Sequence, residues 1–140
     1  MRTAVPGVPV VSSCFRPAPL EPVDARRVFL TTTASPDAAS STARHLESEW
    51  GAAVVGRSTN LAIREQLRDD LEQLGDADVL VTEVKAAGID TAARTACERG
   101  MDVVFLRYDV EFDDGSFDAR VATLADLARR RFAAGPKDHA

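Results

Sequence analysis

The sequence predicts an α/β fold of the Rossmann-like kind, with three αβα layers and a mainly parallel sheet of four to five strands. Two observations predict it. Short apolar runs alternate with stretches of helical periodicity, in the order βαβαβαβα. The runs are continuous rather than alternating, which is typical of strands that are covered on both faces. Single helices between successive strands then imply right-handed crossovers.

The predicted domain covers residues 27–134, between a proline-rich N-terminal arm or linker at 1–26 and a tail at 135–140. The apolar runs are expected as strands at 28–32, 52–55, 79–82 and 103–106. In the arm, residues 8–11 could form a short strand, and residues 16–22 are expected to be extended and polyproline-like.

Helix boundaries follow from capping residues. Ser35 before Pro36 is a start signal, and Asn60 and Ser116 are predicted to cap the second and the last helix. Gly51 is expected to stop the first helix. The apolar faces repeat at helical spacing; they are Ala39, Ala43, Leu46 and Trp50, then Ile63, Leu67, Leu71 and Leu74, then Ile89, Ala92, Ala93 and Ala96, and finally Phe117, Val121, Leu124, Ala128 and Phe132.

Composition narrows the class of function. The net charge is −5, so no broad basic field exists to attract nucleic acid or an anionic membrane. No run of 18 apolar residues and no signal-peptide pattern is present, which predicts a cytoplasmic protein. Cys14 and Cys97 are too few for a metal framework, and Cys97 is expected to be buried on its helix. No metal ligands are predicted.

Candidate ligand-binding residues follow the run at 52–55; they are Arg57, Ser58, Asn60, Arg64 and Arg68. In a parallel sheet, the loops after the carboxyl ends of strands form the ligand crevice. A helix that begins at Asn60 would offer free N–H groups to an anion, and Arg64 would lean back to the same spot. The alternative is that Arg64 and Arg68 pair with acidic neighbours on a solvated face.

A second candidate group is Thr82-Glu83-Val84-Lys85, at the end of the third predicted strand. Lysine occurs only at Lys85 and Lys137, whereas the other cationic side chains are arginines. The choice of lysine at position 85 indicates a site that requires a compact positive charge rather than a planar guanidinium group. Lys85 could hold a phosphate, and Glu83 could orient it, accept a proton or hold magnesium through water. Glu83 and Lys85 are the candidate catalytic residues; the alternative is a surface ion pair.

The hydroxyls at 31–35, Thr32 among them, form a third candidate group for a phosphate, although capping chemistry explains them equally well. Other motifs are absent from the sequence. It contains no Walker A loop, no G-x-G-x-x-G and no credible histidine dyad. On its own, the chain therefore lacks the usual parts for ATP chemistry.

Two gapped patterns, Asn-Leu-x-x-Arg-x-x-Leu-Arg-x-Asp-Leu at 60–71 and Thr-Glu-x-Lys-Ala-Ala at 82–87, carry a family resemblance. With the residues around them, over most of 9–106, they resemble the C-terminal portion of cyclic 2,3-diphosphoglycerate synthetase. The resemblance implies an ATP-dependent enzyme that closes 2,3-diphosphoglycerate into a cyclic phosphoanhydride. ATP and Mg²⁺ are implied for the full-length family, in which a P-loop domain precedes this region. This chain lacks that domain, as a fragment, a split subunit or a relic would.

Three hypotheses stay open. The chain is the substrate-binding segment of such a synthetase, inactive without a P-loop domain or subunit; a non-catalytic module that binds a phosphorylated metabolite or nucleotide; or an interaction domain that docks a partner chain. The first two predict a small anionic phosphorylated metabolite as the ligand. A homodimer is compatible with all three.

Overall fold

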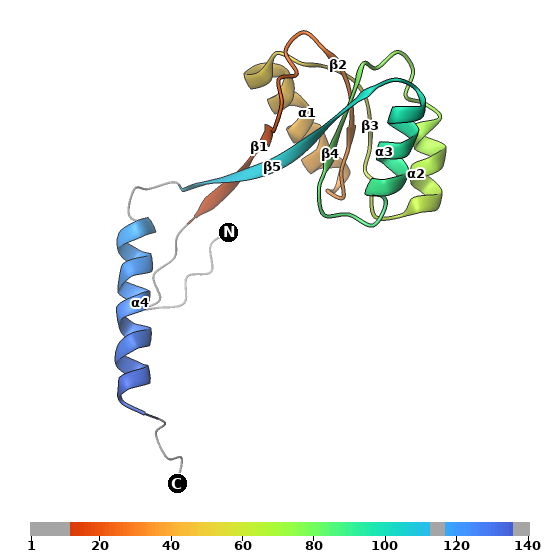
Figure 1. Ribbon diagram of the computed structural model, residues 1–140. Coiled ribbons are helices and arrows are strands. Elements are labelled where there is room, and N and C mark those ends of the chain that lie inside the picture. The colour runs from red at the N-terminus through yellow and green to blue at the C-terminus, as the bar shows by residue number, and fades with distance from the viewer. Residues whose placement is uncertain (1–11, 113–116, 136–140) are drawn as a thin grey trace. The chain divides into compact units, whose positions relative to one another are not determined.

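The computed structural model describes residues 12–112 and 117–135 (Figure 1). The chain divides into two compact units, residues 16–109 and residues 1–15 with 110–140. The strands are β1 Ser13–Pro19, β2 Arg27–Thr31, β3 Ala53–Ser58, β4 Val79–Glu83 and β5 Asp102–Phe112. The helices are α1 Pro36–Trp50, α2 Arg64–Leu71, α3 Ile89–Glu98 and α4 Phe117–Ala133.

The five strands form one sheet in the order β1-β5-β4-β2-β3. The pairs β2–β3, β2–β4 and β4–β5 are parallel. Strand β1 lies at the edge beside β5, and the sheet as a whole is mixed (Figure 1). The predicted α/β class is thus confirmed, and the five strands fall within the predicted four to five, in a sheet that is mixed rather than purely parallel. The finer Rossmann-like description stays a prediction.

Strand β1 corrects the prediction for the proline-rich arm. Pro17, Ala18 and Pro19 are buried, and the Leu20 amide donates to the Phe105 carbonyl at 2.9 Å. Proline is tolerated in a strand at the edge of a sheet, where half of the N–H groups need no partner. The segment that we expected to be a free linker is therefore an edge strand. The strand predicted at 8–11 lies outside the described residues.

The core of the 16–109 unit consists of two apolar clusters, each built on alternate strand residues. Val28 and Leu30 belong to one cluster, which also contains Leu46 of α1. Phe29 belongs to the other, together with Leu67 of α2 and side chains of α3. Because successive side chains of a strand point to opposite faces, the two clusters lie on opposite sides of the sheet. Burial on both sides explains why the strands read as continuous apolar runs.

Helix α1 begins and ends as predicted. The Ser35 hydroxyl accepts a hydrogen bond from the Ala38 amide, Pro36 is the first helical residue, and Gly51 ends the helix with φ of 61°. Helix α2 does not begin as predicted, since its first residue is Arg64 and Ile63 caps it without a side-chain hydrogen bond. The prediction that a helix begins at Asn60 is therefore wrong, and the anion site expected there loses the helix start on which it was based.

The residues beyond Asp109 behave differently from the core. Helix α4 buries none of its residues, although its apolar spacing is regular. Its predicted cap, Ser116, lies outside the described residues.

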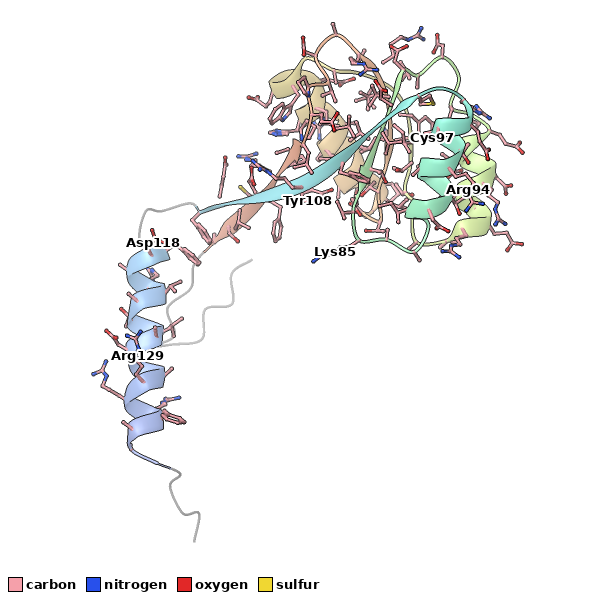
Figure 2. All side chains as sticks on the ribbon, viewed as in Figure 1. Lys85, Arg94, Cys97, Tyr108, Asp118 and Arg129 are labelled. Carbon is pink, nitrogen blue, oxygen red and sulfur yellow. The ribbon has the colours of Figure 1, made fainter. Side chains whose placement is uncertain are left out.

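The expectation that Cys97 is buried was wrong, because this residue is exposed on α3 (Figure 2). Within the described ranges, no helix is long and apolar enough to cross a membrane.

Candidate functional site

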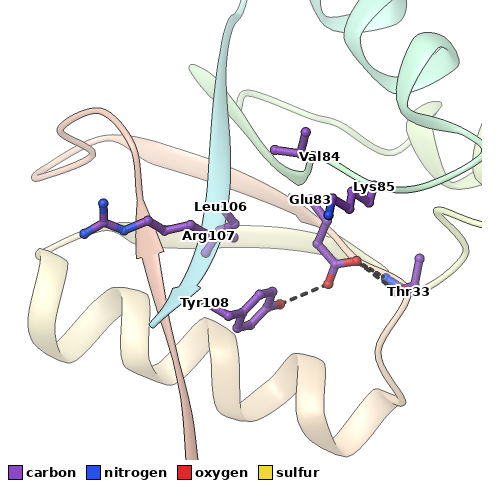
Figure 3. A pocket seen from close by; sticks show the side chains of 7 residues that line it. All are labelled: Thr33, Glu83, Val84, Lys85, Leu106, Arg107 and Tyr108. Carbon is purple, nitrogen blue, oxygen red and sulfur yellow. Dashed lines mark hydrogen bonds between the residues drawn. The ribbon is translucent and has the colours of Figure 1, made fainter. Parts of the chain in front are cut away.

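A pocket of about 640 Å³ lies where β2 and β4 end and β5 continues past them (Figure 3). Glu83, the last residue of β4, pairs with Leu106, so the rest of β5 extends beyond its neighbour. The extension supplies one wall of the pocket, and the segment after β4 supplies another. The lining residues are Thr33, Glu83, Val84, Lys85, Leu106, Arg107 and Tyr108.

Glu83 is held by four hydrogen bonds at the base of this pocket. The Thr32 hydroxyl and the Tyr108 hydroxyl donate to Oε1, the latter at 3.0 Å. The Thr33 amide and hydroxyl donate to Oε2 at 3.1 and 2.8 Å. A carboxylate has about four acceptor positions, so these donors occupy its capacity. Glu83 thereby ties β4 to the segment between β2 and α1 and to β5.

The same contacts set the charge of the group. Burial raises the pKa of Glu83, but the hydrogen bonds from Thr32, Thr33 and Tyr108 outweigh it, and the net effect is a lowered pKa. Burial, the negative charge of Glu83 and the hydrogen bond to it raise the pKa of Tyr108 to about 12. At neutral pH the pair is a carboxylate and a neutral phenol. Glu83 is consequently a weak base and a firm structural anchor.

Lys85 is the cation of the pocket that has no partner among the described residues. Its side chain is exposed and extends away from the loop after β4 (Figure 2). The other cation of the lining, Arg107, is paired with Asp109 at 3.1 Å, with both side chains largely exposed. The ammonium group of Lys85 is therefore available to an anion without first breaking an ion pair.

Ser58 and Asn60, predicted as ligand contacts, instead bind an internal carboxylate. The Ser58 hydroxyl and the Asn60 side-chain amide donate to Asp70 Oδ2 at 2.6 and 2.8 Å. The Asn60 backbone amide donates to the Ser58 hydroxyl at 3.1 Å. These bonds use the polar atoms of Asn60 in a turn before α2, which explains why the helix begins later than expected.

The predicted arginines lie outside the pocket lining. Arg64 donates through Nε to the Ala87 carbonyl at 2.8 Å and pairs with Asp90 at 3.0 Å. It therefore fastens the start of α2 to the same loop that carries Lys85. Arg57 on β3 and Arg68 on α2 are exposed. Their predicted roles as phosphate contacts stay predictions.

Two of the predicted threonines are inaccessible. Thr32 and Thr82 are both 0% exposed. Thr32 bonds Glu83 and also accepts from the Ala34 amide at 3.0 Å, so it shapes the turn after β2. The Thr82 hydroxyl is buried and has no hydrogen-bond partner among the described residues.

The loops at this edge are tied to one another through Leu61. Its amide donates to the Thr32 carbonyl at 3.3 Å, and its carbonyl accepts from the Gly88 amide at 2.8 Å. A Cβ atom on Gly88 would lie 2.4 Å from the Leu61 oxygen, so only glycine allows this approach. The sequence reasoning missed Leu61, Gly88 and Tyr108. The signal for Tyr108 was its being the single tyrosine, just beyond the expected end of its strand.

The fold and the pocket define a small α/β domain with an anchored carboxylate and an unpaired lysine at the carboxyl edge of its sheet. The model of the cyclic 2,3-diphosphoglycerate synthetase C-terminal domain family matches residues 19–109, and the chain belongs to this family. The resemblance inferred from the two sequence patterns is confirmed.

Relatives with the printed name cyclic 2,3-diphosphoglycerate synthetase extend the match. The protein from Methanothermus fervidus is 35% identical over 127 residues, which are 88% of this chain and 28% of that relative. The protein from Rubrobacter xylanophilus is 38% identical over 130 residues, 93% of this chain and 29% of the relative. The chain therefore spans less than a third of the length of these relatives.

Proposed function

We propose that this chain is the substrate-binding C-terminal segment of an ATP-dependent cyclic 2,3-diphosphoglycerate synthetase-like enzyme, and that it is inactive alone. The observation that carries the proposal is the unpaired ammonium group of Lys85 in the pocket at the carboxyl edge of the sheet. A substrate with two phosphates and a carboxylate suits aimed cations in a protein whose net charge is −5. The family membership adds independent support.

In this proposal Lys85 contacts a phosphate of the substrate, and Arg107 supplies a second positive charge when the anion competes with Asp109. Glu83 acts by position. Its carboxylate fixes Thr33 and Tyr108, which line the same pocket, so that the walls keep their geometry when the substrate enters. Intramolecular phosphoryl transfer depends chiefly on such positioning and on neutralising phosphate charge.

The group that the family implies, ATP with Mg²⁺, does not fit the residues of this pocket. The oxygens of Glu83 already accept four hydrogen bonds, so this carboxylate offers no free position to a metal ion. Among residues 12–112 and 117–135, no group of three or more potential ligands is arranged around a common point. We therefore assign the nucleotide to another domain or subunit and route no step through it here.

The second candidate function is a non-catalytic module that binds a phosphorylated metabolite or nucleotide. The observation that favours it is that Glu83, the carboxylate of the pocket, already accepts four hydrogen bonds and has a lowered pKa, so it is poorly suited to act as a general base. The Rossmann-like arrangement belongs to both proposals. It is supported by the α1 side chains in one core cluster and the α2 and α3 side chains in the other.

Isothermal titration calorimetry of the chain with 2,3-diphosphoglycerate, and separately with ADP, tests the proposal. Lys85→Ala should weaken binding of 2,3-diphosphoglycerate by roughly ten- to a hundredfold, since a hydrogen bond to a charged group contributes about 1.5–3 kcal/mol. Arg94→Ala is the matched control, because Arg94 is an exposed cation on α3 outside the pocket lining (Figure 2).

The titrations with 2,3-diphosphoglycerate and with ADP distinguish the two functions. Binding of 2,3-diphosphoglycerate that depends on Lys85, with no binding of ADP, supports the synthetase segment. Lys85-dependent binding of ADP in preference supports the module. Equal affinities of the wild type, Lys85→Ala and Arg94→Ala for both ligands would remove the pocket as the site.

A further inference from the structure

The hydroxyl groups in the pocket give their protons to Glu83 and not to the cavity. We call Thr33, Glu83 and Tyr108 the pocket floor. The hydroxyls of Thr33 and Tyr108 each donate their single proton to Glu83, at 2.8 and 3.0 Å (Figure 3). The Thr33 amide also donates to Glu83, at 3.1 Å. A carboxylate only accepts hydrogen bonds, so the direction of these bonds is fixed and their protons are not offered to a ligand.

Charge divides the pocket into two parts. Glu83 has a lowered pKa and keeps a negative charge at the floor, whereas Lys85 and Arg107 of the same lining are cations. A fully ionised phosphate has only acceptor oxygens. Where such an oxygen approaches the floor, it meets further acceptor atoms and a negative charge, which is unfavourable. An oxygen in that place therefore needs a proton of its own.

We propose that the pocket binds a phosphate group in a protonated form, whose P–OH donates to Thr33 Oγ1 while its charged oxygens face Lys85. The inference rests on the proposed function, in which a phosphate of the substrate enters this pocket. Thr33 Oγ1 is the acceptor because a hydroxyl oxygen keeps acceptor capacity when it donates, and it accepts from none of the described residues. Glu83 already accepts four hydrogen bonds. The proton comes from solvent, and no other bond is made or broken.

The ligands of such a pocket are oxyanions that carry a proton when bound. Hydrogen phosphate and sulfate have similar shapes and the same double negative charge near about pH 8, but only hydrogen phosphate carries a hydrogen. A pocket that recognised charge alone would bind the two equally, whereas the pocket floor favours phosphate. A phosphate monoester loses its second proton at a pKa of about 6, so it must take up a proton when it binds at neutral pH.

Competition calorimetry with the whole chain tests the selectivity. At about pH 8 and constant ionic strength, inorganic phosphate should displace 2,3-diphosphoglycerate at concentrations about tenfold lower than sulfate, or lower still. Titrations in buffers of different ionisation enthalpy count the protons exchanged. Binding of 2,3-diphosphoglycerate should take up close to one proton, and its dissociation constant should rise by about tenfold per pH unit between about pH 7 and 8.5.

A proton taken up in this range is assigned to the ligand, because the pocket lining contains no histidine. The charged and titratable groups at the pocket are Glu83, Lys85, Arg107 and Tyr108, with Asp109 paired to Arg107. Helix α1 approaches Tyr108 through the uncharged Thr42. Carboxyl, ammonium, guanidinium and phenol groups ordinarily titrate below about pH 5 or above about pH 9.

Two substitutions at Thr33 separate the acceptor oxygen from the rest of the side chain. Thr33→Val removes Oγ1 at nearly constant shape and should abolish both the proton uptake and the preference for phosphate over sulfate. Thr33→Ser keeps the hydroxyl and should preserve both. The position is exposed, so the two variants should fold alike, and thermal unfolding checks this.

Glu83→Gln tests the origin of the selectivity. It removes the negative charge and frees the hydroxyls of Thr33 and Tyr108 to donate to a ligand. The variant should therefore bind sulfate about tenfold more tightly than the wild type, although an anchor of the pocket is weakened.

The outcomes separate this inference from the proposed function. A preference for phosphate that Thr33→Val loses and Thr33→Ser keeps, together with proton uptake, supports the protonated ligand. Equal displacement by phosphate and sulfate overturns it, as does 2,3-diphosphoglycerate binding that depends on Lys85 but takes up no proton, and in both cases the proposed function stands. An unchanged affinity of Glu83→Gln for sulfate also overturns it. Absence of any Lys85-dependent binding overturns both.

Discussion

The 16–109 unit and helix α4 carry equally regular apolar patterns, but only the first buries them. Leu67 on α2 is 0% exposed, whereas Leu124 on α4 is 65% exposed. Both residues lie on the apolar face of an amphipathic helix. Periodicity therefore identifies the apolar face of a helix. Whether that face is buried depends on the presence of a second apolar surface of matching shape.

The largest expected effect comes from truncating one leucine in each region. Leu67→Ala should lower the free energy of unfolding by about 2–5 kcal/mol, because it leaves a cavity between α2 and the sheet. Leu124→Ala should change it by less than about 0.5 kcal/mol, because Leu124 is 65% exposed and its truncation leaves no cavity. Urea unfolding followed by the fluorescence of Trp50, the single tryptophan, measures both. A comparable loss for the two variants would show that α4 packs against its own chain.

A smaller loss of stability is expected from a substitution at Gly88, in the loops at the carboxyl edge of the sheet. Gly88→Ala should lower the free energy of unfolding by about 1–3 kcal/mol, because the new Cβ forces the Leu61 carbonyl away and the hydrogen bond between the two loops is lost. Ala87→Ser, at the exposed neighbouring position, is the control and should be close to neutral. Thermal unfolding compares them, and an unchanged midpoint for Gly88→Ala would mean that this edge is loose.

The smallest effect on stability concerns the hydrogen bonds around Glu83. Tyr108 is the only tyrosine, so its ionisation can be followed by ultraviolet absorbance without overlap. The midpoint should lie at about 12 in the wild type. In Glu83→Gln it should fall toward 10 without reaching it, because the charge is removed but the burial remains. A wild-type midpoint at 10 would show that the contact between Tyr108 and Glu83 does not persist in solution.

The pH dependence follows from the direction of each shift. Tyr108 has a raised pKa in the folded protein, so its contribution to stability is present below pH 10 and is lost as the pH rises toward 12. Glu83 has a lowered pKa, so its contribution is present above about pH 4.5 and is lost as the pH falls through the folded value.

Much of the fold was predictable because its signals are local. The apolar runs gave β2, β3 and β4, and Ser35 with Pro36 gave the start of α1. The placement of Lys85 at the end of a strand was also predictable from topology, since the loops after parallel strands share one edge.

The rest depends on partners far away in the sequence. Asn60 is a good helix cap by itself, but Asp70, ten residues later, takes its side chain instead. The second half of β5, from Arg107 to Phe112, alternates polar and apolar residues, which is a local strand signal; it was missed because only continuous apolar runs were interpreted as strands. Tyr108 lies on that extension, so its contact with Glu83 was missed as well.

The prolines of β1 have a consequence for the behaviour of the protein at high concentration. Leu20 turns its N–H toward β5, and since successive amides of a strand point to opposite sides, the nitrogens of Pro17 and Pro19 face outward. These two nitrogens carry no hydrogen, so this margin of the sheet offers few donors to a passing strand. Edge-to-edge pairing with a strand of another chain, which is a common first step of aggregation, is therefore disfavoured at β1.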